Sequence, residues 1–316
     1  MVELGWFVGG LVLLLLGGDS MTKGAAGLAQ HFGASPFRAG LYLLAIATSI
    51  PEVAVNAYAV REGQAELALG NAIGSNLVNL GLTLGVAALV APLAIGLRLA
   101  TIQLVLLLVA GGMVLFFALD GTLARWEGGV LLAGFAGVLA LAAWRAPAED
   151  PAVIAEIGDF AQTDTGLVRN LIRILIAAAV LVLGAYGIVR AAPAIGQALG
   201  FGPLLTGLLP VAIGTALPEV ALAAMAARAG QGNVVIGNVL GASLCNLLLV
   251  LGGMALIAPV AVPLSFVRIE VPAAMALTLA LYPMLGGDFR LGRREGGVLV
   301  ALFAAWVAYE LATVWS

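Results

Sequence analysis

The chain has 316 residues, of which 62% are hydrophobic and 10% are charged, and its formal net charge is -3. Because a typical soluble domain carries roughly 25% charged residues, this composition argues against a soluble enzyme, a nucleic-acid-binding protein and a disordered protein. The single cysteine, Cys245, excludes an intramolecular disulfide and a cysteine-based metal cluster.

Apolar runs separated by charged or Pro/Gly-rich clusters predict an all-α, polytopic membrane protein, in which each span needs about 20 apolar residues. In chain order we expect ten transmembrane helices, over residues 4–28, 36–61, 65–91, 98–118, 126–145, 169–193, 203–228, 231–258, 266–286 and 294–314. The first run lacks the basic start and the evident cleavage site of a secretory signal peptide, so we expect it to remain as a helix.

One polar stretch, residues 146–168, interrupts this series between the fifth and sixth predicted helices. It contains two prolines and five acidic residues, Glu149, Asp150, Glu156, Asp159 and Asp164. We expect a solvated cytoplasmic connector between a first half, residues 1–145, and a second half, residues 169–316. A regulatory cation site in this stretch is the less favoured interpretation, because the acidic residues lack the spacing of a known calcium-binding loop.

An internal repeat relates the two halves. Thr48-x-x-Pro51-Glu52 recurs as Thr215-x-x-Pro218-Glu219, and Gly70-Asn71-x-x-Gly74 recurs as Gly237-Asn238-x-x-Gly241, both at an offset of 167 residues (48 to 215, 70 to 237). Because five spans per half is an odd number, we expect the second half to enter the membrane inverted. Inverted repeats are typical of secondary transporters, which bind their substrates and ions near the midplane between the repeats.

The distribution of Lys and Arg predicts the orientation, since basic residues are enriched in cytoplasmic loops. With the N-terminus outside and ten spans, the inner loops and helix ends hold Lys23, Arg38, Arg98, Arg145, Arg169, Arg173, Arg228, Arg290, Arg293 and Arg294. The outer ones hold Arg61, Arg125, Arg190 and Arg268. This imbalance predicts that both termini lie outside.

Two glutamates, Glu52 and Glu219, lie deep in otherwise apolar predicted spans. A carboxylate inside a membrane is costly and is kept only with a partner or a task. No basic residue lies in either predicted helix within two turns of these glutamates, and two equivalent acids in inverted halves are hard to explain by packing alone. We therefore interpret both glutamates as functional.

The prolines beside the glutamates favour a cation site. Pro51 and Pro218 each remove a helical hydrogen bond, and the carbonyls they free are tolerated within a membrane only against protein or a polar cavity. Thr48 and Thr215 stand four residues before the two glutamates, on the same helix face, and add hydroxyl oxygens. We expect Pro-broken helices whose carbonyls and side chains surround a cation.

The next predicted helix of each half adds oxygen atoms along one face. The i, i+4, i+8 spacing aligns Asn71, Ser75 and Asn79 in the first half, and Asn238, Ala242 and Asn246 in the second. An interhelical hydrogen-bonding role is the alternative for Asn79 and Asn246. Carboxylate, amide, hydroxyl and carbonyl oxygens suit Ca²⁺ or Na⁺ rather than zinc, copper or iron, and one divalent ion would neutralise the two glutamates.

These paired motifs resemble the two alpha repeats of the cation/calcium exchanger superfamily, and most closely those of the prokaryotic sodium/calcium exchangers. The resemblance rests on residues 47–52 with 70–76, and on residues 214–219 with 237–241. It implies ten helices and alternating access, in which the first and sixth helices slide across a core of the other eight that holds the ions. It also implies a transporter of Ca²⁺ and Na⁺ without catalytic residues or a permanently bound cofactor.

The resemblance also implies the ion ligands. The central calcium site of the family maps onto Glu52, Glu219, Thr48 and Thr215. One flanking sodium site maps onto Thr48, Ser49, Glu52, Ser75 and the carbonyl of Ala45. The other maps onto Thr215, Ala216, Glu219, Ala242 and the carbonyl of Ala212, and Asn79 and Asn246 correspond to a polar pair in the middle.

The second half departs from the family pattern. Ala216 and Ala242 stand where hydroxyl residues are usual, and Asn246 stands where Asp is frequent, which weakens one sodium site and makes potassium coupling less favoured. The leading prediction is a Na⁺-driven Ca²⁺ antiporter of a prokaryotic cell membrane. An H⁺/Ca²⁺ antiporter of the same fold is the first alternative, because the glutamates can carry protons. A cation channel is less favoured, because the acids form a pseudo-symmetric pair rather than a ring in an oligomer.

Overall fold

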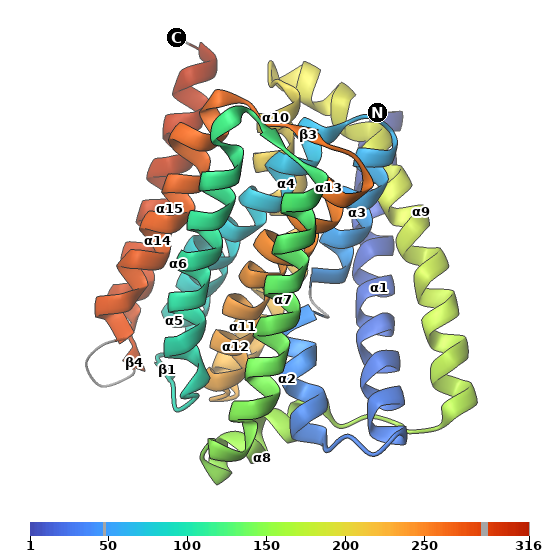
Figure 1. The fold of residues 1–316 in the computed structure, drawn as a ribbon, viewed down its shortest axis with the longest axis vertical. Coiled ribbons are helices and arrows are strands. Elements are labelled where there is room, and N and C mark those ends of the chain that lie inside the picture. Colours follow the sequence, from blue (N-terminus) through green and yellow to red (C-terminus); the bar gives the residue numbers. More distant parts are fainter. Residues whose placement is uncertain (47–48, 286–289, 316) are drawn as a thin grey trace.

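The computed structural model describes residues 1–46, 49–285 and 290–315, nearly all of them helical (Figure 1). The first half contains α1 (Val2–His31), α2 (Pro36–Ile46), α3 (Ile50–Arg61), α4 (Ala65–Leu77), α5 (Leu84–Val90), α6 (Leu99–Phe117) and α7 (Arg125–Arg145). The second half contains α9 (Leu167–Leu199), α10 (Pro203–Thr206), α11 (Ala212–Arg228), α12 (Gly232–Leu244), α13 (Leu251–Ile257), α14 (Val271–Leu285) and α15 (Arg293–Trp315). Four π-helical turns adjoin these helices, at Val78–Thr83, Gly207–Val211, Cys245–Val250 and Phe266–Glu270.

Nine helical segments of the described chain are long and apolar enough to cross a membrane. They agree with nine of the ten predicted spans, and the prediction of a helical, polytopic membrane protein is confirmed. The remaining predicted span, residues 36–61, is occupied by α2 and α3, each of which is shorter than a full span. Residues 47–48, between these two helices, lie outside the described residues, so the tenth span stays a prediction.

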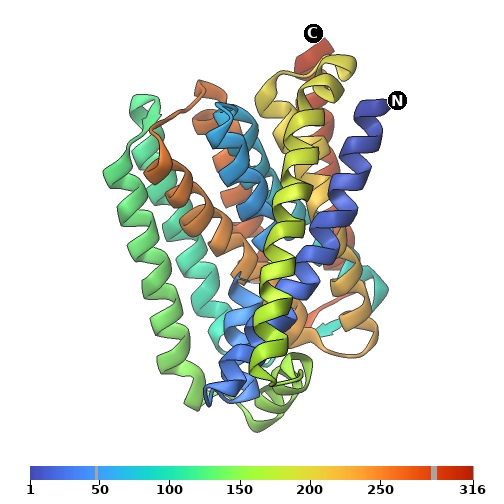
Figure 2. The same ribbon diagram turned by 90° about the vertical axis from the view of Figure 1, so that its right-hand side faces the viewer.

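Two segments occupy the centre of the bundle, and α1 and α9 lie at its edge (Figures 1 and 2). Ala65–Val90 and Gly232–Ile257 have 78% and 94% of their most apolar windows buried, against 28% for α1 and 39% for α9. The central segments are therefore shielded from lipid by other helices, which allows them to carry polar side chains.

Small residues let α1 and α9 pack against each other. A Cβ atom at Gly10 would lie 2.8 Å from the carbonyl oxygen of Gly184, and one at Gly17 would lie 2.8 Å from Cγ of Leu181. Such close backbone approach is a usual way for membrane helices to associate, because lipid supplies no hydrophobic force between them. These glycines therefore have a packing role at the edge of the bundle.

Short strands connect the two halves at opposite ends of the molecule. β1 (Leu93–Ala94) pairs with β4 (Arg290–Leu291), and β2 (Thr122–Leu123) pairs with β3 (Val260–Ala261), both antiparallel. In Figure 1, β1 and β4 lie at the end of the bundle that carries α8, and β3 lies at the end where α1 begins and α15 ends. Each pair joins one strand from each half, so the halves interlock rather than forming separate domains.

The polar linker differs from its prediction, because its middle forms α8 (Pro151–Ala161) instead of a solvated connector. The Asp150 side chain accepts a hydrogen bond of 2.8 Å from the Ala152 backbone N–H, which is a favourable N-cap. Val153, Ile157 and Ala161 are buried, and α8 packs against α2 and α12. An apolar face on a short helix explains why this part of the linker is ordered on the bundle.

Two acidic residues of the linker, Glu149 and Glu156, accept hydrogen bonds from backbone N–H groups outside the linker. The Glu156 carboxylate accepts hydrogen bonds from the backbone N–H groups of Asn233 and Val234, at 3.0 and 3.2 Å, and from Nδ2 of Asn233 at 2.6 Å. Glu149 accepts one of 3.0 Å from the backbone N–H of Arg98. The first N–H groups of a helix have no partner within the helix and favour a negative charge, so Glu156 is explained as an anchor for the start of α12.

Candidate ion-binding site

The two predicted glutamates lie near each other inside the bundle. Glu52 and Glu219 are 2% and 4% exposed, and they lie close enough for direct electrostatic interaction. Oε2 of each carboxylate is buried without a hydrogen-bond partner in the described part of the chain. The ion pairs of the described residues join Lys23 to Asp19 and Arg169 to Asp164, so no basic side chain among them neutralises either glutamate.

The two glutamates occupy different positions on their helices. Glu52 lies in the first turn of α3, after Pro51, where proline is well accommodated because its missing N–H is not needed. Glu219 lies in the interior of α11, which runs without interruption through Pro218. The prediction of a Pro-broken helix is therefore wrong for α11. Pro218 still cannot donate to the carbonyl of Gly214, four residues earlier.

The other predicted ligands surround this pair in part. Thr215 is buried on α11 and contacts the Glu52 carboxylate. Its hydroxyl also lies 3.2 Å from the carbonyl oxygen of Ala212, the first residue of α11. Ala45 belongs to the last turn of α2, and Thr48 lies outside the described residues.

Two serines of the first half that the sequence predicts as ligands are buried. The Ser49 hydroxyl donates to the carbonyl oxygen of Ala242 at 3.4 Å, which links the start of α3 to α12 of the second half. Ser75 is fully buried on α4, and its hydroxyl has no partner. An unpaired buried hydroxyl is costly, so Ser75 is suited to contact a bound ion.

The two central asparagines lie in π-helical turns. Asn79 belongs to Val78–Thr83, and Asn246 belongs to Cys245–Val250. Both are buried, and neither amide atom of Asn246 has a hydrogen-bond partner within residues 1–46, 49–285 and 290–315. Single π-helical turns are frequent at functional sites, because they redirect side chains and disturb the regular hydrogen-bond ladder.

Sequence reasoning missed one member of the site, Asn56. This residue is fully buried on α3, one turn after Glu52, and its Oδ1 accepts a hydrogen bond of 2.9 Å from Nδ2 of Asn71. Oδ1 of Asn71 in turn faces the Thr215 hydroxyl at 3.4 Å. An amide four residues after a glutamate predicted to bind an ion, on the same helix face, was a signal that could have identified Asn56.

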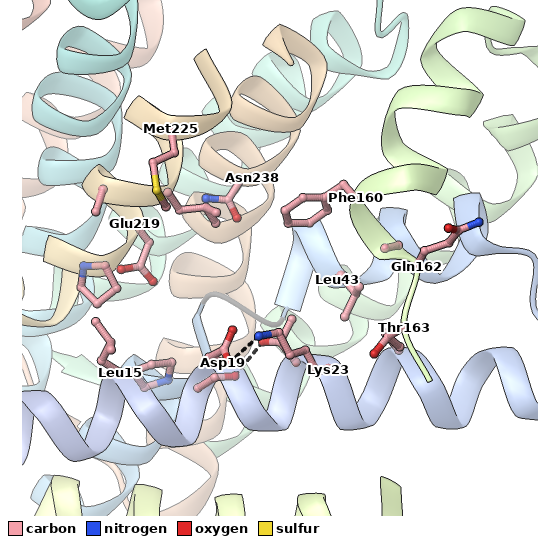
Figure 3. Close-up of a pocket in the computed structure, with 18 residues that line it drawn as sticks. Leu15, Asp19, Lys23, Leu43, Phe160, Gln162, Thr163, Glu219, Met225 and Asn238 are labelled. Carbon is pink, nitrogen blue, oxygen red and sulfur yellow. Dashed lines mark hydrogen bonds and ion pairs between the residues drawn. The ribbon is translucent and has the colours of Figure 1, made fainter. Parts of the chain in front are cut away.

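A cavity of about 490 Å³ reaches the site from one side (Figure 3). Glu219 and Asn238 line one part of it, and residues 160–163 of the linker line another part. The ion-paired Asp19 and Lys23 of α1 also line it. Pro51 is among the lining residues and Glu52 is not, so the two glutamates differ in access from this side.

Comparisons with known proteins agree with this architecture. The family model described as sodium/calcium exchanger protein matches residues 2–144 and 170–312. The putative antiporter CaxA of Alkalimonas amylolytica is 33% identical over 303 residues, covering 94% of this chain and 95% of that protein. The inner membrane protein YrbG of Escherichia coli is 32% identical over 311 residues, covering 95% of this chain and 94% of that protein.

A solved structure of the sodium-calcium exchanger NCX_Mj has a similar fold, with a TM-score of 0.67 and 28% sequence identity. The match covers 97% of this chain and 98% of the exchanger. The matching family model, the relatives of similar length and the shared fold identify a transporter and not an enzyme. This chain belongs to the sodium/calcium exchanger protein family.

Proposed function

We propose that the protein is an antiporter that exchanges Ca²⁺ for Na⁺ by alternating access. The observation that carries the proposal is the proximity of two buried carboxylates, Glu52 and Glu219, one from each half, with no basic partner among the described residues. Together they carry a formal charge of -2, which one Ca²⁺ or two Na⁺ would neutralise. Because Ca²⁺ and Na⁺ would neutralise the same pair of carboxylates, they compete for it, and such competition is the basis of exchange.

The remaining predicted residues complete the ion ligands. Thr48 and Thr215 add hydroxyl oxygens to the Ca²⁺ site beside the two glutamates. Ser49, Ser75 and the carbonyls of Ala45 and Ala212 serve the flanking Na⁺ sites. Asn79 and Asn246 lie between them as polar neighbours. This set is made of hard oxygen ligands, which Ca²⁺ accepts in flexible geometry.

The relatives support this assignment through their names, since one is a putative antiporter and a solved neighbour is a sodium-calcium exchanger. The named inner membrane relative supports placement in a prokaryotic cell membrane. We place both termini outside, on the excess of basic residues at the opposite side. This orientation assigns α8, and the linker side of the cavity, to the cytoplasm.

Proton coupling is the second candidate, and a specific observation favours it. Ala216 and Ala242 are buried where hydroxyl ligands would serve a second Na⁺. The loss of two ligands weakens the case for sodium, whereas the two glutamates could carry protons without them. The two candidates share the fold and the glutamates and differ in the counter-ion.

The experiment is ⁴⁵Ca²⁺ uptake into proteoliposomes, with the membrane potential clamped by potassium and valinomycin. An outward Na⁺ gradient at equal pH should drive uptake, and a pH gradient without Na⁺ should not. Uptake driven by the pH gradient alone would replace the sodium proposal with the proton-coupled one. Uptake that needs neither gradient and follows only the Ca²⁺ gradient would point to a channel.

A further inference from the structure

Two equivalent asparagines, Asn71 and Asn238, have different surroundings in the two halves. Nδ2 of Asn71 donates to Asn56, and its Oδ1 faces the Thr215 hydroxyl. Oδ1 of Asn238 is buried and has no hydrogen-bond partner among the residues that the structure describes. The 167-residue offset places Ala223 at the position equivalent to Asn56, so the second half lacks the amide that holds Asn71.

The unpartnered amide oxygen of Asn238 lies in the wall of the cavity, near Glu219. Asn238 on α12 is 2% exposed, and Glu219 on the neighbouring α11 is 4% exposed. Both line the 490 Å³ cavity, and Figure 3 shows both side chains projecting into it from the same wall. Oε2 of Glu219 is also without a partner.

A buried oxygen without a hydrogen-bond donor is costly, so its retention beside a carboxylate calls for a ligand. An amide oxygen and a carboxylate oxygen are both ligands that Ca²⁺ accepts. The other charged residues of the lining, Asp19 and Lys23, are paired with each other at 2.8 Å. The formal negative charge of the cavity lining therefore comes from Glu219.

We propose that Asn238 and Glu219 form a cation subsite in the wall of this cavity, through which Ca²⁺ enters or leaves the central site. This inference rests on the proposed function and deepens it. The subsite uses an amide oxygen in the half where Ala216 and Ala242 remove two hydroxyls. In the first half Asn71 is held by Asn56 and takes no such part.

The subsite predicts that giving Asn238 a hydrogen-bond partner will weaken ion binding. Ala223→Asn copies the Asn56–Asn71 arrangement into the second half, and Asn238→Ala removes the oxygen outright. We expect each change to weaken equilibrium ⁴⁵Ca²⁺ binding to the purified protein by about tenfold, in line with the cost of disturbing ligand shells. Asn238→Asp keeps an oxygen at this position and should retain or strengthen binding.

Met225→Leu is the matched control, because Met225 lines the same cavity without an oxygen ligand. Binding by this variant should stay within about twofold of the unaltered protein, as expected for a volume-conserving change. Size-exclusion profiles and thermal unfolding identify any variant that does not fold. Since Ala223→Asn leaves Asn238 in place, it still decides the question if Asn238→Ala is unstable.

The outcomes separate this inference from the proposed function. Unchanged ⁴⁵Ca²⁺ binding in folded Asn238→Ala and Ala223→Asn, with normal Na⁺-driven exchange, overturns the subsite alone. Weakened binding in both variants, with exchange driven by protons instead of Na⁺, supports the subsite and overturns the sodium coupling. An unaltered protein that neither binds nor transports Ca²⁺ overturns the proposed function and the subsite together.

Discussion

The two halves of the site carry the same short motif and place it in different local structures. In the first half, Glu52 lies in the first turn of α3, and the buried Ser49 and Ser75 supply hydroxyls. In the second half, Glu219 lies within a continuous helix beside an open cavity, and alanines replace the hydroxyls. The repeated motif thus determines which two carboxylates lie near each other. The residues around each copy determine how open its glutamate is to the cavity and how many oxygen ligands lie beside it.

The largest expected effect comes from neutralising either member of the shared pair. Glu52→Gln and Glu219→Gln should each reduce Ca²⁺ transport by at least about 100-fold, because one carboxylate leaves a divalent ion half-neutralised in a low-dielectric site. Purified variants should remain folded, since an amide is less costly to bury than a charge. Near-normal ⁴⁵Ca²⁺ flux in either variant would remove that glutamate from the site.

Substituting the two prolines should affect transport differently in the two halves. Pro218→Ala allows residue 218 to donate to the Gly214 carbonyl within α11, and we expect transport to fall by about tenfold with little loss of stability. Pro51→Ala should have a smaller effect, because the first turn of α3 needs no N–H at this position. Flux and thermal unfolding of both variants test this difference, and equal losses of flux would contradict it.

The missing hydroxyls can be restored. Ala216→Ser combined with Ala242→Ser should raise the apparent Na⁺ affinity, or the cooperativity of Na⁺ activation, by about threefold, since each hydroxyl adds a neutral ligand for a hard cation. Ca²⁺ uptake measured against Na⁺ concentration gives both quantities. An unchanged Na⁺ dependence in a folded, active double variant would show that hydroxyl number does not limit the second half.

The smallest effect on transport is expected at the linker. Glu156→Gln weakens the hydrogen bonds at the start of α12 and should lower the free energy of unfolding by about 1–3 kcal/mol, with transport changed less than about twofold at a permissive temperature. Asp159→Asn, at an exposed position of the same helix, is the control and should leave stability unchanged. Thermal unfolding in detergent compares the stability of the Glu156→Gln and Asp159→Asn variants. Equal stability of both would contradict the role of Glu156 as an anchor for the start of α12.

Much of this architecture follows from the sequence, because long apolar runs leave few alternatives in a membrane. The ends of α4–α5, α7 and α15 agree with the predicted runs to within a few residues. The meeting of Glu52 and Glu219 could be anticipated from their equivalent positions. The cost of burying two such carboxylates is the physical basis of that inference.

Other features depend on contacts between segments far apart in the chain. The burial of Val153 and Ile157 requires the surfaces of α2 and α12, so a short helix in a charged linker was not predicted. The Asn56–Asn71 hydrogen bond requires α3 to pack on α4 in a defined register. The continuity of α11 through Pro218 shows that surrounding helices can override a local breaking signal.

If Na⁺ and Ca²⁺ compete for one pair of carboxylates, as we propose, the Na⁺ gradient sets the point at which net Ca²⁺ flux reverses. In proteoliposomes at equal pH and clamped potential, net ⁴⁵Ca²⁺ flux should vanish where the Ca²⁺ concentration ratio equals the square of the Na⁺ ratio. That point should not move with membrane potential, because two Na⁺ replace one Ca²⁺ without net charge. A cubic dependence on the Na⁺ ratio would contradict the two-sodium stoichiometry, and a reversal point that ignores Na⁺ and follows pH would contradict sodium exchange itself.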